Sequence, residues 1–224
     1  LQTLAASFIN SPVLQRHTNY IYDKGGIYKI FNGNLLYHGC IPTKEDGSFD
    51  DVYIDGQYLS GMKYLKQVED KVRKAFYCEV GSEEQLNALD YCWYLWSGPK
   101  SPLFGKNKMT TFERYFIEDK ATHKEHYNPY YYHIEHKEYC KSILKEFDLD
   151  VDKSHIVNGH VPVKTHKGES PIKGEGILLV IDGGLSKAYH KNTGIGGYTL
   201  ISNSNMMIIA EHRPFAEVVE SGFK

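Results

Sequence analysis

The apolar residues within 57–77 recur at intervals of three and four, which is the spacing of one face of an α-helix. A capping box, Ser-Glu-Glu-Gln at 82–85, predicts the start of a second helix that runs to about Trp96. In that second helix the residues expected to face the core are Leu86, Leu89, Trp93 and Trp96. Shorter helical stretches are predicted at 111–115 and 131–147.

Strand-like segments lie on both sides of these helices. A hairpin is predicted within 25–42, with one strand at 27–31, an Asn-Gly-Asn turn, and a second strand at 35–38. Further strands are predicted at 156–158, 176–181, 198–202 and 205–211. Strands at both ends of the chain, with helices between them, predict an α/β protein.

The remaining stretches are expected to be irregular. Residues 1–18 have a mixed pattern with a turn signal at Ser11-Pro12, and the acidic segment 45–56 is expected to be a loop. Residues 97–108 form a loop rich in glycine and proline. Its three lysines are Lys100, Lys106 and Lys108. Such a loop is most often solvated, but it can also face a phosphate group or another subunit, and the pattern leaves these alternatives open.

Composition narrows the class of protein. Hydrophobic residues at 41% and charged residues at 24% are ordinary for a soluble globular protein. A chain of 224 residues can bury a real core and can hold one or two domains. No apolar run approaches 18 residues, so no membrane span is expected. The net charge of −2 shows no basic excess, which argues against nucleic acid as the main partner.

The cysteines and the first residues bear on location. Cys40, Cys78, Cys92 and Cys140 are widely spaced without a Cys-x-x-Cys pattern, as expected for reduced cysteines in a cytoplasmic protein. The start of the chain lacks the basic and apolar regions of a secretory signal. It also lacks an initiator methionine, which fits a fragment of a longer protein. We therefore expect a cytoplasmic location.

Two histidines stand beside glycine where predicted strands end. His38-Gly39 closes the hairpin, and Gly159-His160 follows the strand at 156–158. Imidazole is the commonest metal ligand among side chains, and glycine allows the backbone to bend. The pair therefore suits a metal centre whose ligands come from several strand ends. Because the chain has 11 histidines, two unrelated turn histidines are an alternative.

Other patterns of this kind carry less weight. His133 and His136 are spaced i, i+3 on a predicted helix, but no His-Glu-x-x-His pattern accompanies them, so surface histidines are expected. The glycine cluster at 194–197 lacks the strand-turn-helix setting of a dinucleotide fingerprint. NAD binding is therefore rejected.

Five longer passages resemble one known family. They are Leu95-Trp-Ser-Gly-Pro-Lys-Ser-Pro-Leu-Phe-Gly105, Met109-Thr-Thr-Phe-Glu-Arg114, Asn158-Gly-His-Val-Pro-Val-Lys164, Lys167-Gly-Glu-Ser-Pro-Ile-Lys173 and Leu179-Val-Ile-Asp-Gly-Gly184. Together with the His-Gly and Gly-His corners, they resemble class 3 fructose-1,6-bisphosphatase, the Firmicutes type within the calcineurin-like metallophosphoesterase superfamily. The resemblance runs over nearly the whole chain.

This resemblance implies a fold and a division of the chain. Residues 1–45 and 151–224 would form the C-terminal part of an α/β/β/α metallophosphoesterase sandwich, and 46–150 would be a mainly helical insertion. The family's earlier blocks, Asp-x-His, Gly-Asp-x-x-Asp-Arg and Gly-Asn-His-Glu, do not occur in this sequence. The chain therefore looks like a C-terminal segment that holds part of the active site.

The same resemblance implies the chemistry. His38 and His160 would both bind the same one of two metals, and the family suggests manganese, Mn²⁺, although nitrogen and oxygen ligands also suit zinc or iron. Two metals about 4 Å apart activate a bridging water and clamp phosphate oxygens. The reaction implied is hydrolysis of the 1-phosphate of fructose 1,6-bisphosphate to fructose 6-phosphate, a step of gluconeogenesis. The segment 182–199 would lie over the mouth of the site.

The substrate has a second phosphate that needs cations. Candidates for binding it are Lys164, Lys167, Lys173 and Arg114. Solvated surface side chains are the alternative for each, and no catalytic residue is assigned, since His155 has an equal chance of pointing away. The alternative functions are an inactive segment with a role in assembly, or a phosphatase of other specificity on the same fold. A homo-oligomer is left open.

Overall fold

The computed structural model describes residues 1–183, 186, 197–203 and 205–212. The helices are α1 (Gln2–Ile9), α2 (Pro12–Lys24), α3 (Gly61–Tyr77), α4 (Glu83–Ser97), α5 (Thr111–Phe116), α6 (Tyr130–His133) and α7 (Lys137–Glu146), with 3₁₀ turns η1 (Lys120–His123), η2 (Thr165–Lys167) and η3 (Gly174–Gly176). The strands are β1 (Tyr28–Phe31), β2 (Asn34–Tyr37), β3 (Val52–Ile54), β4 (Gln57–Leu59), β5 (Ile156–Asn158), β6 (Ile172–Lys173), β7 (Leu178–Val180), β8 (Tyr198–Ser202) and β9 (Met207–Glu211). The predicted α/β class is confirmed.

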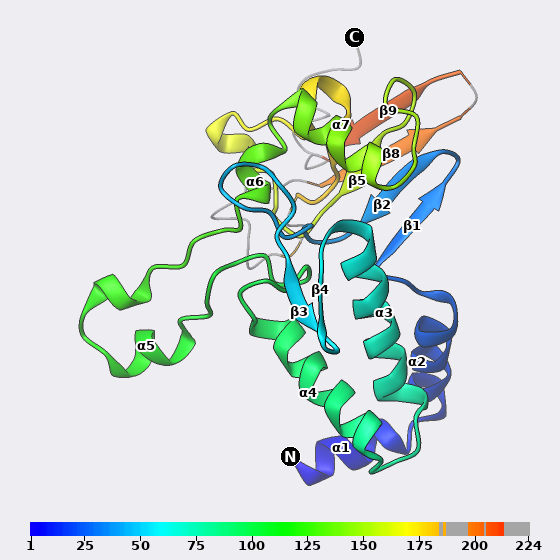
Figure 1. Cartoon of the computed structure of the whole chain (residues 1–224), viewed down its shortest axis with the longest axis vertical. Coiled ribbons are helices and arrows are strands. Elements are labelled where there is room, and N and C mark those ends of the chain that lie inside the picture. The colour runs from blue at the N-terminus through cyan, green and yellow to red at the C-terminus, as the bar shows by residue number, and fades with distance from the viewer. Residues whose placement is uncertain (184–185, 187–196, 204, 213–224) are drawn as a thin grey trace, which may run out of the picture.

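A five-stranded mixed sheet, in the order β1-β2-β5-β7-β6, organises one end of the molecule (Figure 1). Its three inner strands β2, β5 and β7 are parallel, and the edge strands β1 and β6 run antiparallel to their neighbours. Leu35 of β2 lies opposite Ile156 of β5, which in turn lies opposite Leu178 of β7. Because the inner strands are parallel, the residues that follow their carboxyl ends meet at one edge of the sheet.

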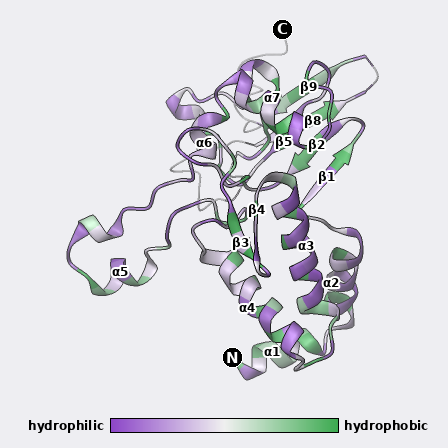
Figure 2. Ribbon diagram, viewed as in Figure 1, coloured by the Kyte–Doolittle hydropathy of each residue, from purple (hydrophilic) through white to green (hydrophobic). Residues whose placement is uncertain are grey.

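The core lies on one face of this sheet. Leu35, Ile156 and Leu178, which share that face by strand alternation, are completely buried and belong to one cluster with Val68 of α3 and Ile143 of α7. In Figure 2 the strands are largely hydrophobic, whereas the outward side of α3 is hydrophilic. Each such buried aliphatic side chain stabilises the fold by about 1.5–3 kcal/mol.

Helix α2 begins where the sequence suggested a turn, at Ser11-Pro12. Ser11 is the N-cap of α2, and its hydroxyl accepts a hydrogen bond from the Leu14 amide at 3.4 Å. Pro12 occupies the first turn, where a missing amide hydrogen costs nothing. At the other end of α2, Arg73 of α3 donates to the Tyr22 and Gly25 carbonyls. Ser11-Pro12 is therefore a helix start.

The expectation that 45–56 is a loop is partly wrong, because the short hairpin of β3 and β4 begins within this segment. The turn residues Asp55 and Gly56 have φ of 49° and 82°, as the tightest hairpin turns require. Asp-Gly is a strong hairpin signal that the helical spacing obscured. Consequently α3 begins at Gly61 instead of 57.

The expectation that the apolar stripe of α4 faces the core is wrong. Leu86, Leu89, Trp93 and Trp96 are 53%, 46%, 67% and 59% exposed. The opposite face, with Ala88 and Leu95, is buried instead. The α4 face against α3 is also tied by polar contacts, since the Tyr91 and Tyr64 hydroxyls are 2.9 Å apart. Small and amphipathic residues thus form the packed face.

Between α4 and α6 the chain forms an arm, residues 105–128, that extends away from the body with α5 at its far end (Figure 1). Backbone hydrogen bonds close its base, from Asn107 to the His126 carbonyl and from Asn128 to the Gly105 carbonyl. The helix predicted at 131–147 is divided into α6 and α7 by the irregular residues between them.

The last predicted strands agree in position with β7, β8 and β9, of which β8 and β9 form a separate antiparallel hairpin. Strand β6 was not predicted, since two residues are too short to show a pattern. Most of 182–199, expected over the mouth of the site, lies outside the described residues, as do three of the four positions of the glycine cluster at 194–197.

Candidate functional site

The two glycine-flanked histidines lie together at the carboxyl edge of the sheet. His38 directly follows β2, and His160 follows β5 after Gly159. His160 Nδ1 and His38 Nε2 are 3.2 Å apart, and the ring planes are inclined at 82°. His160 has a φ of 69°, in the left-handed region that few non-glycine residues occupy. The structure thus brings the two predicted metal ligands into contact.

The Phe104 carbonyl determines which nitrogen of His160 is available. It lies 3.1 Å from His160 Nε2, and because a carbonyl can only accept, Nε2 must carry the hydrogen. A neutral imidazole has one N–H, so Nδ1 then carries the lone pair. This lone pair accepts a hydrogen bond from His38 Nε2. The same lone pair is suited to binding a cation.

Backbone contacts hold the two corners together. The Asn158 side-chain amide donates to the carbonyls of Tyr37, His38 and Gly39, at 3.2, 3.2 and 2.7 Å. The Gly159 amide donates to the His38 carbonyl at 3.1 Å. A buried amide that satisfies three carbonyls gives the pair a rigid base. In the Asn-Gly-His sequence, Asn158 and Gly159 therefore hold the two corners together, and His160 supplies the ring nitrogen.

The loop 101–106 crosses the first corner at very close range. The Cys40 amide donates to the Pro102 carbonyl at 2.8 Å. A side chain at Gly39 would overlap that carbonyl oxygen, so only glycine fits there. Two residues later the same loop supplies the Phe104 carbonyl to His160. A loop from the mainly helical segment 46–150 thus forms part of the histidine site.

Burial lowers the pKa of His160 below its usual value of about 6.5, against the hydrogen bond to the Phe104 carbonyl, which raises it. The neighbouring His38 and Lys106 lower this pKa further, whereas Asp182 raises it. His160 is therefore neutral at pH 7, which is the form that binds a metal. Within the part of the chain that the structure describes, Lys106 and Asp182 are the charged side chains that act on this pKa.

Asp182 was not predicted as a site residue. It stands two positions after β7, the third inner parallel strand, so its place at the same edge as the histidines follows from the sheet order. The signal that would have found it is a carboxylate just past a buried strand. Asp182 also has contacts within the fold, including the bond from the Val163 amide to its carbonyl at 2.9 Å.

The histidine pair fits a metal but does not complete a site. Two nitrogens that each bind one ion at ~2.1 Å lie ~3 Å apart when their bonds are close to perpendicular, which agrees with 3.2 Å. Within the described residues, no group of three His, Cys, Asp or Glu side chains is placed to hold a metal ion. Further ligands would have to come from elsewhere.

A hollow of about 220 Å³ adjoins the histidine corner. Asn158 and Gly159 line it together with Lys164 and Lys173, two of the predicted phosphate-binding residues. Lys173 is paired with Glu135, which also lines the hollow. Two of the four candidate cations therefore line one hollow with Asn158 and Gly159, the residues that precede His160.

The other two candidates lie elsewhere. Lys167 is exposed in η2 and does not line this hollow. Arg114 lies in the arm, where it donates to Thr110 Oγ1 at 3.0 Å and to the His123 carbonyl at 3.4 Å, and lies 3.7 Å from Glu125. The arm's own polar contacts thus engage the Arg114 guanidinium.

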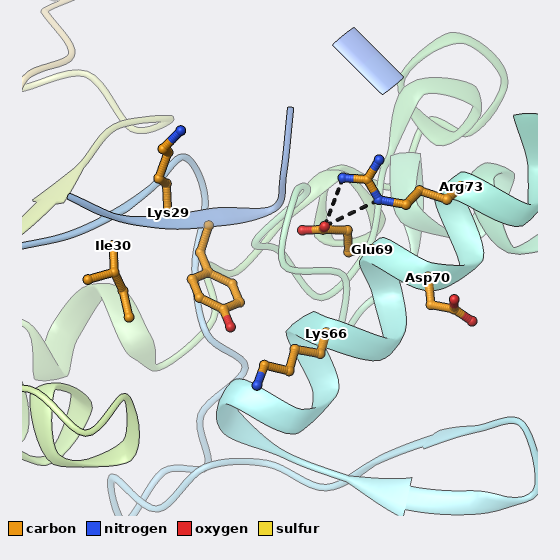
Figure 3. A pocket seen from close by; sticks show the side chains of 7 residues that line it. Lys29, Ile30, Lys66, Glu69, Asp70 and Arg73 are labelled. Atoms are coloured by element: carbon orange, nitrogen blue, oxygen red, sulfur yellow. Dashed lines mark hydrogen bonds and ion pairs between the residues drawn. The ribbon is translucent and has the colours of Figure 1, made fainter. Parts of the chain in front are cut away.

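A further hollow of about 550 Å³ lies between β1 and α3, lined by Lys29, Lys66 and Arg73 (Figure 3). The Arg73 guanidinium is paired with Glu69 at 2.9 Å, as the dashed lines show, and Glu69 also accepts from the Ile27 amide at 3.1 Å. These contacts join α3 to the start of the sheet. The hollow therefore has a structural explanation.

Two other expectations have structural outcomes. The His133 ring bonds the Glu45 carbonyl at 3.1 Å, and the rings of His133 and His136 are 6.4 Å apart. Cys40, Cys78, Cys92 and Cys140 are all free thiols.

Among the described helices, none has the length and apolar character needed to span a membrane.

Comparison with known proteins identifies the family. A model of the Firmicute fructose-1,6-bisphosphatase family matches residues 1–222, so the chain belongs to that family. Curated relatives called fructose-1,6-bisphosphatase class 3, from Clostridium botulinum (strain Loch Maree / Type A3) and Clostridium novyi (strain NT), are each 52% identical to it over 218 residues. The matched region is 97% of this chain and 33% of each relative. No solved structure matches the chain.

The chain thus spans about a third of the length of the curated relatives it matches. That share is consistent with the expectation that the chain corresponds to a segment of the family's proteins.

Proposed function

We propose that this chain contributes to the active site of a phosphoric monoester hydrolase that removes the 1-phosphate of fructose 1,6-bisphosphate. The observation that carries the proposal is the His38–His160 pair, with two imidazole nitrogens 3.2 Å apart at the carboxyl ends of the parallel inner strands of the mixed sheet. Family membership supports the substrate, since the relatives bear that enzyme's name. The product would be fructose 6-phosphate, the product expected in gluconeogenesis.

In this proposal His38 and His160 hold one divalent cation, Mn²⁺ for preference, and the remaining ligands lie in the part of the relatives that this chain does not span. When bound, such a cation polarises a phosphate oxygen and lowers the pKa of a water molecule. The chain's own contribution is to present neutral nitrogens. The Phe104 carbonyl fixes the His160 tautomer, and Asn158 fixes the distance between the corners.

Lys164 and Lys173 are proposed to bind the phosphate that is not cleaved. They line the hollow beside the histidine corner, so a sugar bisphosphate held there could extend from the pair to both ammonium groups. Lys173 would exchange its partner Glu135 for a phosphate oxygen. Lys167 and Arg114 are weaker candidates because neither lines this hollow.

The proposal extends to the fold. We infer an α/β/β/α metallophosphoesterase sandwich in which 1–45 and 151–224 take part and 46–150 is an insertion. Support comes from β2 and β5, which belong to the two outer segments and pair directly, while the segment between them contributes α3 to α7.

A second candidate function is an inactive segment that serves assembly. The absence of a third nearby metal ligand among the described residues favours it for the isolated chain. The two candidates differ in what a longer protein would do.

The test is phosphate release from fructose 1,6-bisphosphate with Mn²⁺, measured for this chain and for a protein of the relatives' full length that contains it. We expect little or no release by the chain alone and release by the longer protein. His38→Ala and His160→Ala should abolish that release, whereas His126→Ala, which removes an exposed arm histidine, should not. Release that survives both site substitutions would refute the assignment.

A further inference from the structure

The three lysines within residues 97–108 have different surroundings. Lys100 Nζ donates to Asp50 at 3.0 Å and to the Asp51 carbonyl at 3.1 Å, away from the arm. Lys108 Nζ donates to the Thr122 carbonyl at 3.0 Å, within the arm. Lys106 Nζ donates to Glu125 at 2.8 Å. Each lysine thus has an acceptor, and Lys106 is the one nearest in sequence to Phe104, whose carbonyl contacts His160.

Lys106 stands closest to the site along the loop. It is two residues beyond Phe104, whose carbonyl is bonded to His160 at 3.1 Å. Its ammonium lies 5.4 Å from the centre of the Tyr127 ring, and Tyr127 lines the hollow that Lys164 and Lys173 share. Lys106 therefore lies close in sequence to the carbonyl that contacts His160, and its ammonium lies near a ring that lines the hollow.

Lys106 and the charged side chains that contact its partner Glu125 carry a net positive charge. Glu125 accepts from Lys106, from the Thr110 amide at 3.0 Å and from Thr110 Oγ1 at 2.9 Å, and Arg114 lies 3.7 Å away. One carboxylate therefore serves two cations, which leaves this group of three charged side chains at +1. An ammonium has three N–H donors, and within the described residues one is used, by Glu125.

We propose that Lys106 is a phosphate-binding residue of the site, held in place by Glu125. The ligand class is a phosphate monoester, bound where the loop 104–106 meets the histidine pair. Glu125 is a positioning residue, because its carboxylate orients the Lys106 side chain and would itself repel phosphate. Arg114 then balances the charge of Glu125 from the far side. The inference deepens the proposed function and rests on it.

The experiment is an NMR titration of the ¹⁵N-labelled chain with inorganic phosphate at low ionic strength. Binding should shift the amides of Lys106, Tyr127 and Gly159. In Lys106→Gln the apparent affinity should fall about tenfold, since a charge-assisted bond is lost. Lys106→Arg should restore most of it, because the charge and the pairing with Glu125 are kept. Lys108→Gln, the matched control in the same arm, should bind as the unaltered chain does.

Glu125→Gln separates positioning from contact. We expect a smaller loss of affinity, about threefold, with the Lys106 amide still shifted by phosphate. Equal loss in Lys106→Gln and Lys108→Gln, or no phosphate-dependent shift at Lys106, would overturn the inference. If Lys106→Gln weakens phosphate binding but the longer protein never releases phosphate from the sugar bisphosphate, the site inference stands and the proposed function fails. If release occurs and Lys106→Gln changes neither binding nor KM, the proposed function stands and the inference about Lys106 fails.

Discussion

Glycine stands next to each of the two histidines, with a different physical reason in each case. At Gly39 a methyl group would overlap the Pro102 carbonyl oxygen, which is fixed by the Cys40 amide. At Gly159 the nearest atoms to an added methyl group are 3.5 Å away or more, which is ordinary contact. The first glycine is required by packing, and the second is not.

Gly39→Ala should therefore destabilise the chain by about 2 kcal/mol, the cost of overpacking against rigid backbone. Gly159→Ala should cost well under half of that. Urea denaturation of both variants checks the difference. Equal losses would mean that the loop 101–106 moves aside easily, contrary to the contact described.

Glu125 gives a pH dependence with a definite sign. Partial burial acts to raise its pKa, but the hydrogen bonds from Lys106 and Thr110 outweigh it and lower the pKa to about 2. In the unfolded chain a glutamate titrates near 4.3. The stabilisation by Glu125 is therefore complete above pH ~4.3 and is lost as the pH falls towards 2.

We expect Glu125→Gln to lower the free energy of opening of the arm by about 2 kcal/mol at pH 6, and this difference to shrink by pH 3. Hydrogen exchange of segment 105–128 measures it. Glu118→Gln, at an exposed arm position, is the control and should change little at either pH. If the difference in the free energy of opening between Glu125→Gln and the unaltered chain stays constant with pH, the charge of Glu125 does not hold the arm closed.

At this scale the sequence predicted the histidines but not their neighbours. The His-Gly and Gly-His corners are local patterns, visible without any structure. Lys106 and Asp182 act on His160 only because a loop and a third strand converge on one edge. Convergence of that kind depends on tertiary packing, which single-residue patterns do not encode.

Among the elements, α4 shows how an apolar stripe can mislead. Leu86, Leu89, Trp93 and Trp96 have a spacing typical of a packed helix face, yet all four are exposed. Trp93 and Trp96 contact each other, with ring centres 5.0 Å apart. Periodicity identified the stripe correctly but could not say which face meets α3. Among the strands, β8 was predicted at its exact residues, 198–202.

The two faces of α4 should respond differently to truncation. Leu95→Ala should cost about 3 kcal/mol, since Leu95 is 3% exposed and belongs to the core. Trp93→Ala should cost under ~1 kcal/mol, mainly through its ring contact with Trp96. Urea denaturation compares them. A loss at Trp93 as large as that at Leu95 would show that the stripe is covered in solution.

At the scale of the whole molecule, the number of metal ligands determines how strongly the chain can bind a metal. Two ligands in the described chain predict weak binding of at most one Mn²⁺ ion. At ten times its dissociation constant such an ion would stabilise the fold by about 1.4 kcal/mol, a gain that appears as a rise in Tm.

His38→Gln and His160→Gln should each remove that rise, and His126→Gln should keep it. Thermal unfolding with and without Mn²⁺ is the measurement. A rise that persists in both site variants would place the ion elsewhere.

The pairing of β2 with β5 has a consequence for folding kinetics. It brings together His38 and His160, which are 122 positions apart in the chain. Closing a loop of that length costs about 4 kcal/mol of chain entropy before any contact is made. Parallel pairing between such distant strands is slow compared with the formation of α3, α4 and their local contacts. The histidine pair should therefore assemble late, so that a newly synthesised chain would acquire its metal-binding geometry only after the intervening helices have folded.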